Sequence, residues 1–285
     1  MLVHESSERY DQRQNWVRYR LFHDNFTLFE FEGYTIKNKQ VSGLFDRKLV
    51  TDISLLNLDK QENLYNQVKE KELYLNEKLK FSRLLNIDYR YVIYSYIPEL
   101  LNVYHVYENT IELKKSYNSF CSFAEGTLSL RDLKMLSKYF EDGLPQIDKI
   151  MRDRCKIPWM GNLDSVLAIN GIPVAIIEFQ TTIRDRVKDH CNNKWFQTTN
   201  FRKGDEQRWM VLDIVARQAK LPLVIIVWSP NEIDGDIKFK IVEKINYSTE
   251  FTYDKKQKVG LIYSKKILVK YQELIKYLLA LREAE

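Results

Sequence analysis

Two carboxylates lie at the adjoining ends of two apolar runs in the segment 161–182, which reads GNLDSVLAINGIPVAIIEFQTT. Asp164 opens the first run, Asn170 and Gly171 form a turn signal, and Glu178 stands near the end of the second run. A carboxylate beside a buried hairpin is costly unless an opposite charge accompanies it. A divalent cation held by oxygen atoms is such a partner, so the segment predicts a metal-dependent active site.

The register of this hairpin decides whether the two carboxylates share a face, because side chains alternate along a strand. A two-residue loop at the Asn-Gly pair would place Asp164 and Glu178 on opposite faces. A three-residue loop that adds Ile169, with Gly171 in the left-handed conformation, would pair position 168 with 172. We favour this second register, in which Asp164, Glu178 and Gln180 lie on one face. The motif by itself leaves the other register open.

The elements around the hairpin follow the order helix, strand, strand, helix, strand. Asp205 is expected to cap a helix that runs to residue 219, and the continuous apolar run 221–228 predicts a strand covered on both sides. Segments 237–245 and 259–263 are expected as edge strands, and 271–282 as a closing helix. We therefore expect an α/β (α+β) fold in which helices flank a central mixed sheet, with its core in residues ~115–230.

The first half of the chain gives a less regular pattern. Alternation predicts strands within 17–31, 89–97 and 101–107, and apolar spacing predicts one amphipathic helix over 60–85. A second helix is expected from Ser129 towards Met151.

The carboxylate hairpin resembles the PD-(D/E)XK nuclease superfamily, to which many restriction and defence nucleases belong. In that family an Asp begins one strand, a Glu-x-Lys triplet ends the next, and a helix and a further strand follow. The resemblance covers about residues 120–230. It implies that Asp164, Glu178 and the backbone carbonyl of Phe179 bind Mg²⁺, with Mn²⁺ as a substitute, and that Glu125 is a further candidate ligand.

This sequence departs from the family pattern at two positions. Leu163 stands where the family has Pro, and Gln180 stands where it has the Lys of the triplet. Gln cannot act as a cation, but it can still position a water molecule. Asp164, Glu178 and Gln180 are therefore the expected catalytic residues, and the metal would supply most of the activation of the attacking water.

Basic residues follow the hairpin closely. Arg184, Arg202, Lys203 and Arg208 are expected to contact nucleic-acid phosphates, since guanidinium and ammonium groups are the usual phosphate ligands. DNA is the expected partner, with RNA and a second copy of the chain as further possibilities. In this interpretation residues 1–115 form a recognition or dimerisation region of unknown fold, and residues 116–285 form the nuclease-like domain.

Composition limits the other possibilities. The chain has 285 residues and a formal net charge of +5, which permits nucleic-acid binding without arguing for it strongly. It lacks the ~18 consecutive apolar residues of a membrane span, so a cytoplasmic protein without a membrane partner is expected. Cys121, Cys155 and Cys191 form no CxxC pair, and we expect three reduced thiols.

Three functional interpretations follow. The first is a Mg²⁺-dependent endonuclease that hydrolyses DNA and is of restriction or defence type. The second is a catalytically inactive nuclease-like fold that binds nucleic acid or a protein. In the third, Asp164 is a turn residue, Glu178 pairs with a nearby Arg, and the chain is an interaction protein.

Overall fold

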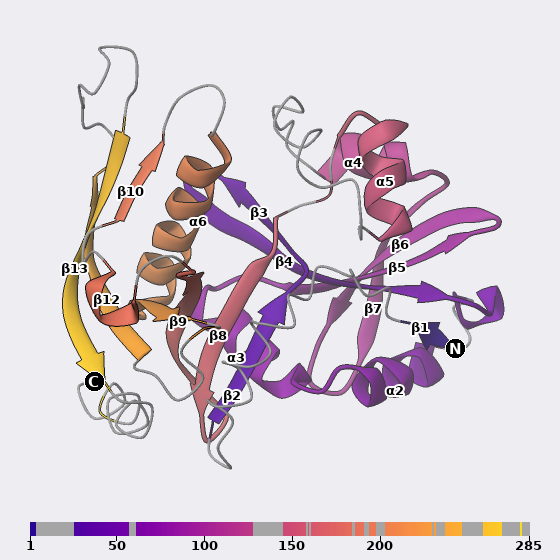
Figure 1. Cartoon of the computed structure of the whole chain (residues 1–285). Coiled ribbons are helices and arrows are strands. Elements are labelled where there is room, and N and C mark those ends of the chain that lie inside the picture. The colour runs from indigo at the N-terminus through magenta and orange to yellow at the C-terminus, as the bar shows by residue number, and fades with distance from the viewer. Residues whose placement is uncertain are drawn as a thin grey trace. The chain divides into compact units, whose positions relative to one another are not determined.

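The computed structural model describes residues 1–3, 26–56, 61–127, 145–157, 159, 161–183, 186–190, 194–197, 203–229, 231, 237–246, 259–269 and 280. Within these residues the chain is an α+β protein with two mixed β-sheets and five α-helices (Figure 1). This confirms the expected fold class. None of the described helices is long and apolar enough to cross a membrane.

The chain divides into two compact units, each built around one of the sheets. The first unit comprises Met1–Tyr10 and Glu30–Leu163, and the second comprises Asp11–Phe29 and Asp164–Glu285. The division therefore differs from the expected one, which separates residues 1–115 from residues 116–285. The reason is that two helices beyond residue 115 pack on the first sheet.

Six described strands form the sheet of the first unit, in the order β1-β4-β5-β6-β7, with β3 paired to β4. These strands are β1 (Leu2–Val3), β3 (Gly33–Lys37), β4 (Gln40–Val50), β5 (Tyr89–Tyr96), β6 (Glu99–Val106) and β7 (Ile111–Tyr117). β4 and β5 run parallel, and the other neighbours run antiparallel. The strands predicted over 89–97 and 101–107 are confirmed as β5 and β6.

Helices cover both faces of this sheet (Figure 1). One face carries α2 (Gln61–Lys71) and α3 (Leu75–Leu84), and the other carries α4 (Phe120–Thr127) and α5 (Gln146–Asp153). Alternation along β4 gives each face its own contacts. Asp46 pairs with Lys78 of α3, whereas Phe45 packs in an apolar cluster with Phe120 and Met151.

The helices of the first unit differ from the expected ones in three respects. Two helices replace the single helix predicted over 60–85, and α3 buries Leu75 and Leu79 in the expected amphipathic manner. The start of the helix predicted from Ser129 lies outside the described residues, while its last part is α5, which begins after Pro145. Helix α4 was not predicted.

A disulfide joins Cys121 of α4 to Cys155, which follows α5, and their Cα atoms are 4.9 Å apart. The prediction of reduced thiols is therefore wrong for these two residues. The two cysteines are 34 residues apart in sequence, and only the packing of α4 against α5 brings them together. Cys191 lies outside the described residues.

The described part of the second unit has a seven-stranded sheet in the order β10-β13-β12-β11-β9-β8-β2. Its elements are β2 (Phe26–Phe31), β8 (Leu163–Ile169), β9 (Ile172–Thr181), β10 (Lys194–Gln197), α6 (Lys203–Ala219), β11 (Leu223–Trp228), β12 (Ile237–Asn246) and β13 (Val259–Val269). β8 and β9 form an antiparallel hairpin, and α6 leads from β9 to the parallel strand β11. The predicted order strand, strand, helix, strand is confirmed.

Several details of this unit differ from the sequence predictions. β12 and β13 are interior strands, because the unpredicted β10 pairs with β13 at the edge. Helix α6 begins at Lys203, so Asp205 lies inside it and is not its cap. Most of the helix predicted over 271–282 lies outside the described residues.

Candidate functional site

The hairpin of β8 and β9 turns through two residues, and the predicted three-residue loop is wrong. Ile169 pairs with Ile172, and both loop residues have positive φ, 51° for Asn170 and 72° for Gly171. This is the geometry of a type I′ turn, for which Asn-Gly is the favoured sequence. The turn matches the right-handed twist of the flanking strands better than the loop that we favoured.

A β-bulge next to this turn restores the register that a shared site needs. Ala168 pairs with Pro173, Leu167 pairs with Ala175, and Val166 pairs with Ile176. The extra residue in β9 shifts the pairing by one position. Extended by two residues, this register aligns backbone position 164 with position 178. The two positions were expected to share a face of the sheet, and this register agrees with that expectation, although the turn was predicted incorrectly.

Glu178 and Gln180 are buried in β9, with exposed fractions of 1% and 8%. The other face of β9 carries apolar side chains, including Phe179, in the core cluster with Val224 and Ile226 of β11. The two polar side chains thus lie on the face opposite this apolar core. The side chain of the partner position, 164, lies outside what the structure describes.

Two buried lysines lie on the same sheet face as the polar pair of β9. Ile225 pairs with both Glu178 and Lys240, and the next row across the sheet likewise joins position 180 to Lys238. Lys240 and Lys238 have exposed fractions of 0% and 1%. With strands about 4.8 Å apart, Glu178 and Lys240 are roughly 10 Å apart along the row. Sequence reasoning missed these lysines, although two lysines at alternate positions of IKFKI were a visible signal.

His190, which follows the short 3₁₀ helix Val187–Asp189, holds both ammonium groups. Nζ of Lys240 lies 3.0 Å from Nδ1 of His190, and Nζ of Lys238 donates to the His190 carbonyl oxygen. An ammonium group can only donate, so Nδ1 of His190 accepts this hydrogen bond. The face of Glu178 and Gln180 therefore also carries two buried lysines, both held in place by His190.

The remaining predicted site residues are not brought together by the described structure. Glu125 is exposed on α4 and belongs to the first unit. Arg184 and Arg202 lie outside the described residues, and only the backbone of Lys203 and Arg208 is described, within α6. Among the residues that the structure describes, no group of three or more His, Cys, Asp or Glu could hold a metal ion.

Comparisons with known proteins do not assign this chain to a family. No family model matches the chain, and no curated protein matches it. The crystal structure of a sex pheromone staph-cAM373 precursor aligns with 90% of this chain and 93% of its own, at 9% sequence identity and a TM-score of 0.14. A similarity this low supports no conclusion about fold or function.

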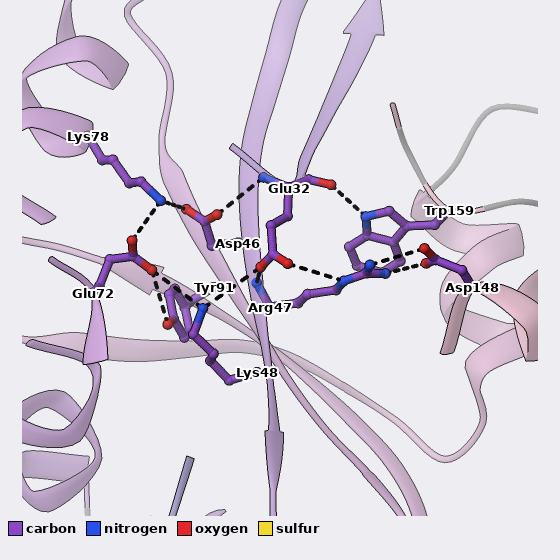
Figure 2. Close-up of polar contacts among 9 residues, drawn as sticks. All are labelled: Glu32, Asp46, Arg47, Lys48, Glu72, Lys78, Tyr91, Asp148 and Trp159. Carbon is purple, nitrogen blue, oxygen red and sulfur yellow. Dashed lines mark hydrogen bonds and ion pairs between the residues drawn. The ribbon is translucent and has the colours of Figure 1, made fainter. Parts of the chain in front are cut away.

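A network of buried charges in the first unit was not predicted at all (Figure 2). Lys78 bridges Asp46 and Glu72, with Nζ 2.7 Å from Oδ2 of Asp46 and 2.8 Å from Oε1 of Glu72. Their side chains are exposed by 4%, 2% and 10%, respectively. The hydroxyl of Tyr89 also donates to Asp46, at 2.5 Å. The run Asp46-Arg47-Lys48, which stands between the apolar pairs Leu44-Phe45 and Leu49-Val50, was the sequence signal that we missed.

The network continues to the opposite face of the sheet through Arg47. This guanidinium pairs with Asp148 of α5 and lies 4.4 Å from the ring centroid of Trp159. The backbone carbonyl of Glu32 accepts a hydrogen bond from Trp159, at 2.7 Å. The ion pairs of this network therefore join α3, α5 and β4 within the described part of the first unit.

Burial gives Asp46 an unusual protonation equilibrium. It raises the pKa of Asp46 from 3.8 to about 6, although Lys78 acts to lower it. Burial also acts to raise the pKa of Glu72, but Lys78 and Lys48 together lower it below its usual value. The charged or titratable groups that face Asp46 are Lys78, Glu72, Glu32, Lys48 and Tyr89.

A raised pKa in the folded state means that the folded state binds this proton more tightly than the unfolded chain does. The stabilisation is present below pH 3.8 and is lost as the pH rises through about 6. The full loss amounts to roughly 3 kcal/mol. Replacing Asp46 by Asn should remove this dependence, so that wild type loses stability relative to the variant between these pH values.

Urea unfolding of both proteins at a series of pH values measures this difference. Glu72 acts in the opposite direction and only below its usual pKa, so the range from pH 4.5 to 6 isolates Asp46. A constant difference in unfolding free energy across this range would contradict the prediction.

Proposed function

We propose that this protein is a Mg²⁺-dependent endonuclease that hydrolyses phosphodiester bonds in DNA. The observation that carries the proposal is the register of β8 and β9, which aligns position 164 with Glu178. The hairpin is followed by α6 and by the parallel strand β11, the order that the PD-(D/E)XK resemblance implies. A nuclease of restriction or defence type is the member of this class that we propose.

Asp164, Glu178 and the backbone carbonyl of Phe179 would hold the cation. All three offer oxygen atoms, which are the ligands that Mg²⁺ prefers, and Mn²⁺ would serve as a substitute. When bound, the metal supplies a water molecule of lowered pKa and stabilises charge on the phosphate. Gln180, on the same face as Glu178, would hold the attacking water by a hydrogen bond.

Lys240 would contribute the positive charge that the Glu-x-Gln triplet lacks. It lies on the face of Glu178 and is held by His190 at 3.0 Å. In a water-poor site a fixed ammonium group stabilises a developing negative charge more strongly than in water. Arg184, Arg202, Lys203 and Arg208 would contact flanking phosphates and position the strand.

A cleavage assay on duplex and single-stranded DNA and RNA tests the proposal directly. Each substrate is incubated with the full chain in Mg²⁺, in Mn²⁺ and in EDTA. Cleavage of DNA that EDTA abolishes is the expected result. The proposal fails if no substrate is cut under any of these conditions.

Substitutions at Gln180 separate positioning of water from supply of charge. Gln180→Lys should keep or raise the cleavage rate, because it adds a cation beside the scissile phosphate. Gln180→Ala should lower the cleavage rate by about a hundredfold, because a reacting group misplaced by about 1 Å costs a factor of this order. Single-turnover rates at saturating Mg²⁺ measure both. Equal rates for wild type and Gln180→Ala would remove Gln180 from the reaction.

A nucleic-acid-binding module without activity is the second candidate, and Gln180 in place of the family lysine is the observation that favours it. This candidate predicts DNA binding that weakens steeply with salt, without cleavage. Filter-binding titrations at several salt concentrations, run beside the cleavage assay, distinguish the two candidates.

A further inference from the structure

The first unit contains a groove on the sheet face that α4 and α5 cover. Its volume is about 550 Å³, within the usual range of ligand sites. The apolar cluster under the two helices includes Phe45, Val92 and Val103. The last turn of α4, which includes Gly126 and Thr127, lines one side of the groove, and residues of β3 to β7 line the rest of it. The described part of the groove therefore lies between the end of α4 and the sheet.

Positive charge dominates the described lining of this groove. Lys37, Arg90, Lys114 and Lys115 line it, together with a single carboxylate, Glu125. A β-bulge in β7 makes Lys114 an extra residue, because Val103 pairs with Lys115 and the next residue of β6 pairs with position 113. Neighbours on a regular strand point to opposite faces, so the bulge is what allows both lysines to line one groove.

Two buried nitrogen atoms of the lining lack a hydrogen-bond partner among the described residues, Nε of Arg90 and Nε2 of His105. His105 is only 7% exposed, and its other ring nitrogen, Nδ1, lies 3.5 Å from Oδ2 of Asp88. The Arg90 guanidinium is held by the Ser42 carbonyl oxygen at 3.4 Å. Both atoms are out of reach of water, so a ligand in the groove would contact them only after a small shift of the two side chains. A buried polar atom left unsatisfied costs about 1–3 kcal/mol, and such a contact would recover that cost.

The two nitrogen atoms differ in their hydrogen-bonding roles, so each needs a different group on the ligand. Arg90 Nε is a donor and needs an acceptor such as a phosphate oxygen. Burial lowers the pKa of His105, against the effect of Asp88, so the ring is neutral at pH 7. Its proton then belongs on Nδ1, which faces the Asp88 carboxylate, and Nε2 accepts a hydrogen bond. A matching ligand combines an anion with a hydroxyl or amino group.

We propose that this groove binds a nucleotide phosphate, with Arg90, Lys114 and Lys115 on the phosphate and His105 Nε2 accepting from the sugar or base. The same chemistry occurs in a free nucleotide and in one unit of a nucleic-acid strand. The proposal does not rest on the nuclease function, because every residue that it uses belongs to the first unit.

Isothermal titration calorimetry of the full chain in EDTA tests this, with a nucleoside monophosphate, inorganic phosphate and a twelve-nucleotide single strand as probes. The double variant Lys114→Gln/Lys115→Gln should weaken nucleotide binding by about tenfold or more, since two charged contacts are lost. Lys69→Gln/Lys71→Gln removes the same charge from exposed positions of α2 and should change binding less than twofold. His105→Phe should weaken the nucleotide but not inorganic phosphate, whereas His105→Gln retains an acceptor and should recover part of the loss.

Competition between the probes shows whether the groove binds a free nucleotide or one unit of a nucleic-acid strand. A strand that displaces the mononucleotide identifies a unit of nucleic acid as the ligand, and a strand that does not displace it identifies a free nucleotide. Absence of binding by every probe would overturn the proposal. Equal weakening by the groove variant and the α2 variant would also overturn it, because attraction would then reflect net charge alone. The titration is done in EDTA and so measures nucleotide binding without divalent metal. Its result is therefore independent of whether the cleavage assay detects activity.

Discussion

Glu178→Gln is expected to lower the Mg²⁺-dependent cleavage rate by about a hundredfold to a thousandfold while the protein stays folded. The substitution keeps the size of a side chain that is 1% exposed and removes only its charge. A neutral amide holds Mg²⁺ far more weakly than a carboxylate does. Losing a group that stabilises transition-state charge typically costs about 10²–10³ in rate. Single-turnover cleavage of duplex DNA over a range of Mg²⁺ concentrations measures the effect.

The matched control for this variant is Glu243→Gln. Glu243 lies on β12 of the same sheet but is exposed, so the same loss of one carboxylate should leave the rate unchanged within a factor of about two. Asp164→Asn should behave like Glu178→Gln. Circular dichroism and thermal unfolding establish that each variant is folded. Full activity in both the Asp164 and Glu178 variants would place the reaction elsewhere in the molecule.

Lys78→Met is expected to destabilise the first unit by about 3–5 kcal/mol. The variant leaves Asp46 and Glu72 buried without the ammonium group that bridges them at 2.7 and 2.8 Å. Removing one partner of a buried ion pair is costly because the other charge stays behind in a poor solvent. Hydrogen exchange of the amides of β4 and β5 measures the change in that unit specifically.

Two further variants test this explanation. Lys71→Met removes a lysine whose side chain is 38% exposed and pairs with Glu70, so it should cost less than about 0.5 kcal/mol. Lys78→Met combined with Asp46→Asn should be more stable than Lys78→Met alone, because one stranded charge has been removed. If Lys78→Met costs no more than Lys71→Met, the network contributes no stability.

Local sequence patterns predicted most of the strands correctly. The alternation in β5 and β6 and the apolar run of β11 depend on few neighbours, so they were visible without the fold. The same is true of the order hairpin, helix, strand that contains Glu178. Features that combine distant segments were not predicted. The Cys121–Cys155 disulfide requires the packing of α4 on α5, and the position of β10 as an edge strand requires its pairing with β13.

The hairpin shows where local information stops. The Asn170-Gly171 pair was enough to predict a turn, but the bulge that follows it depends on how β9 is held between β8 and β11. The bulge aligns position 164 with position 178. The predicted three-residue loop does not form and has no part in this alignment. The shorter turn shifts the predicted pairing by one residue, and the unpredicted bulge shifts it by one more. The shift of two residues leaves the same residues on each face, because side chains alternate along a strand.

The sequence by itself determined the fold class, the order of the elements around Glu178 and the chemical types available there. The tertiary structure alone decided which charges lie together. It placed Lys240 two strands across from Glu178, joined Lys78 to Asp46 and Glu72, and gathered Arg90, His105 and the lysines of β7 in one groove. Secondary structure follows from periodicity within one segment. Charge clusters arise from strand pairing and packing between segments that are far apart in the sequence. The pattern of residues within one segment therefore does not predict them.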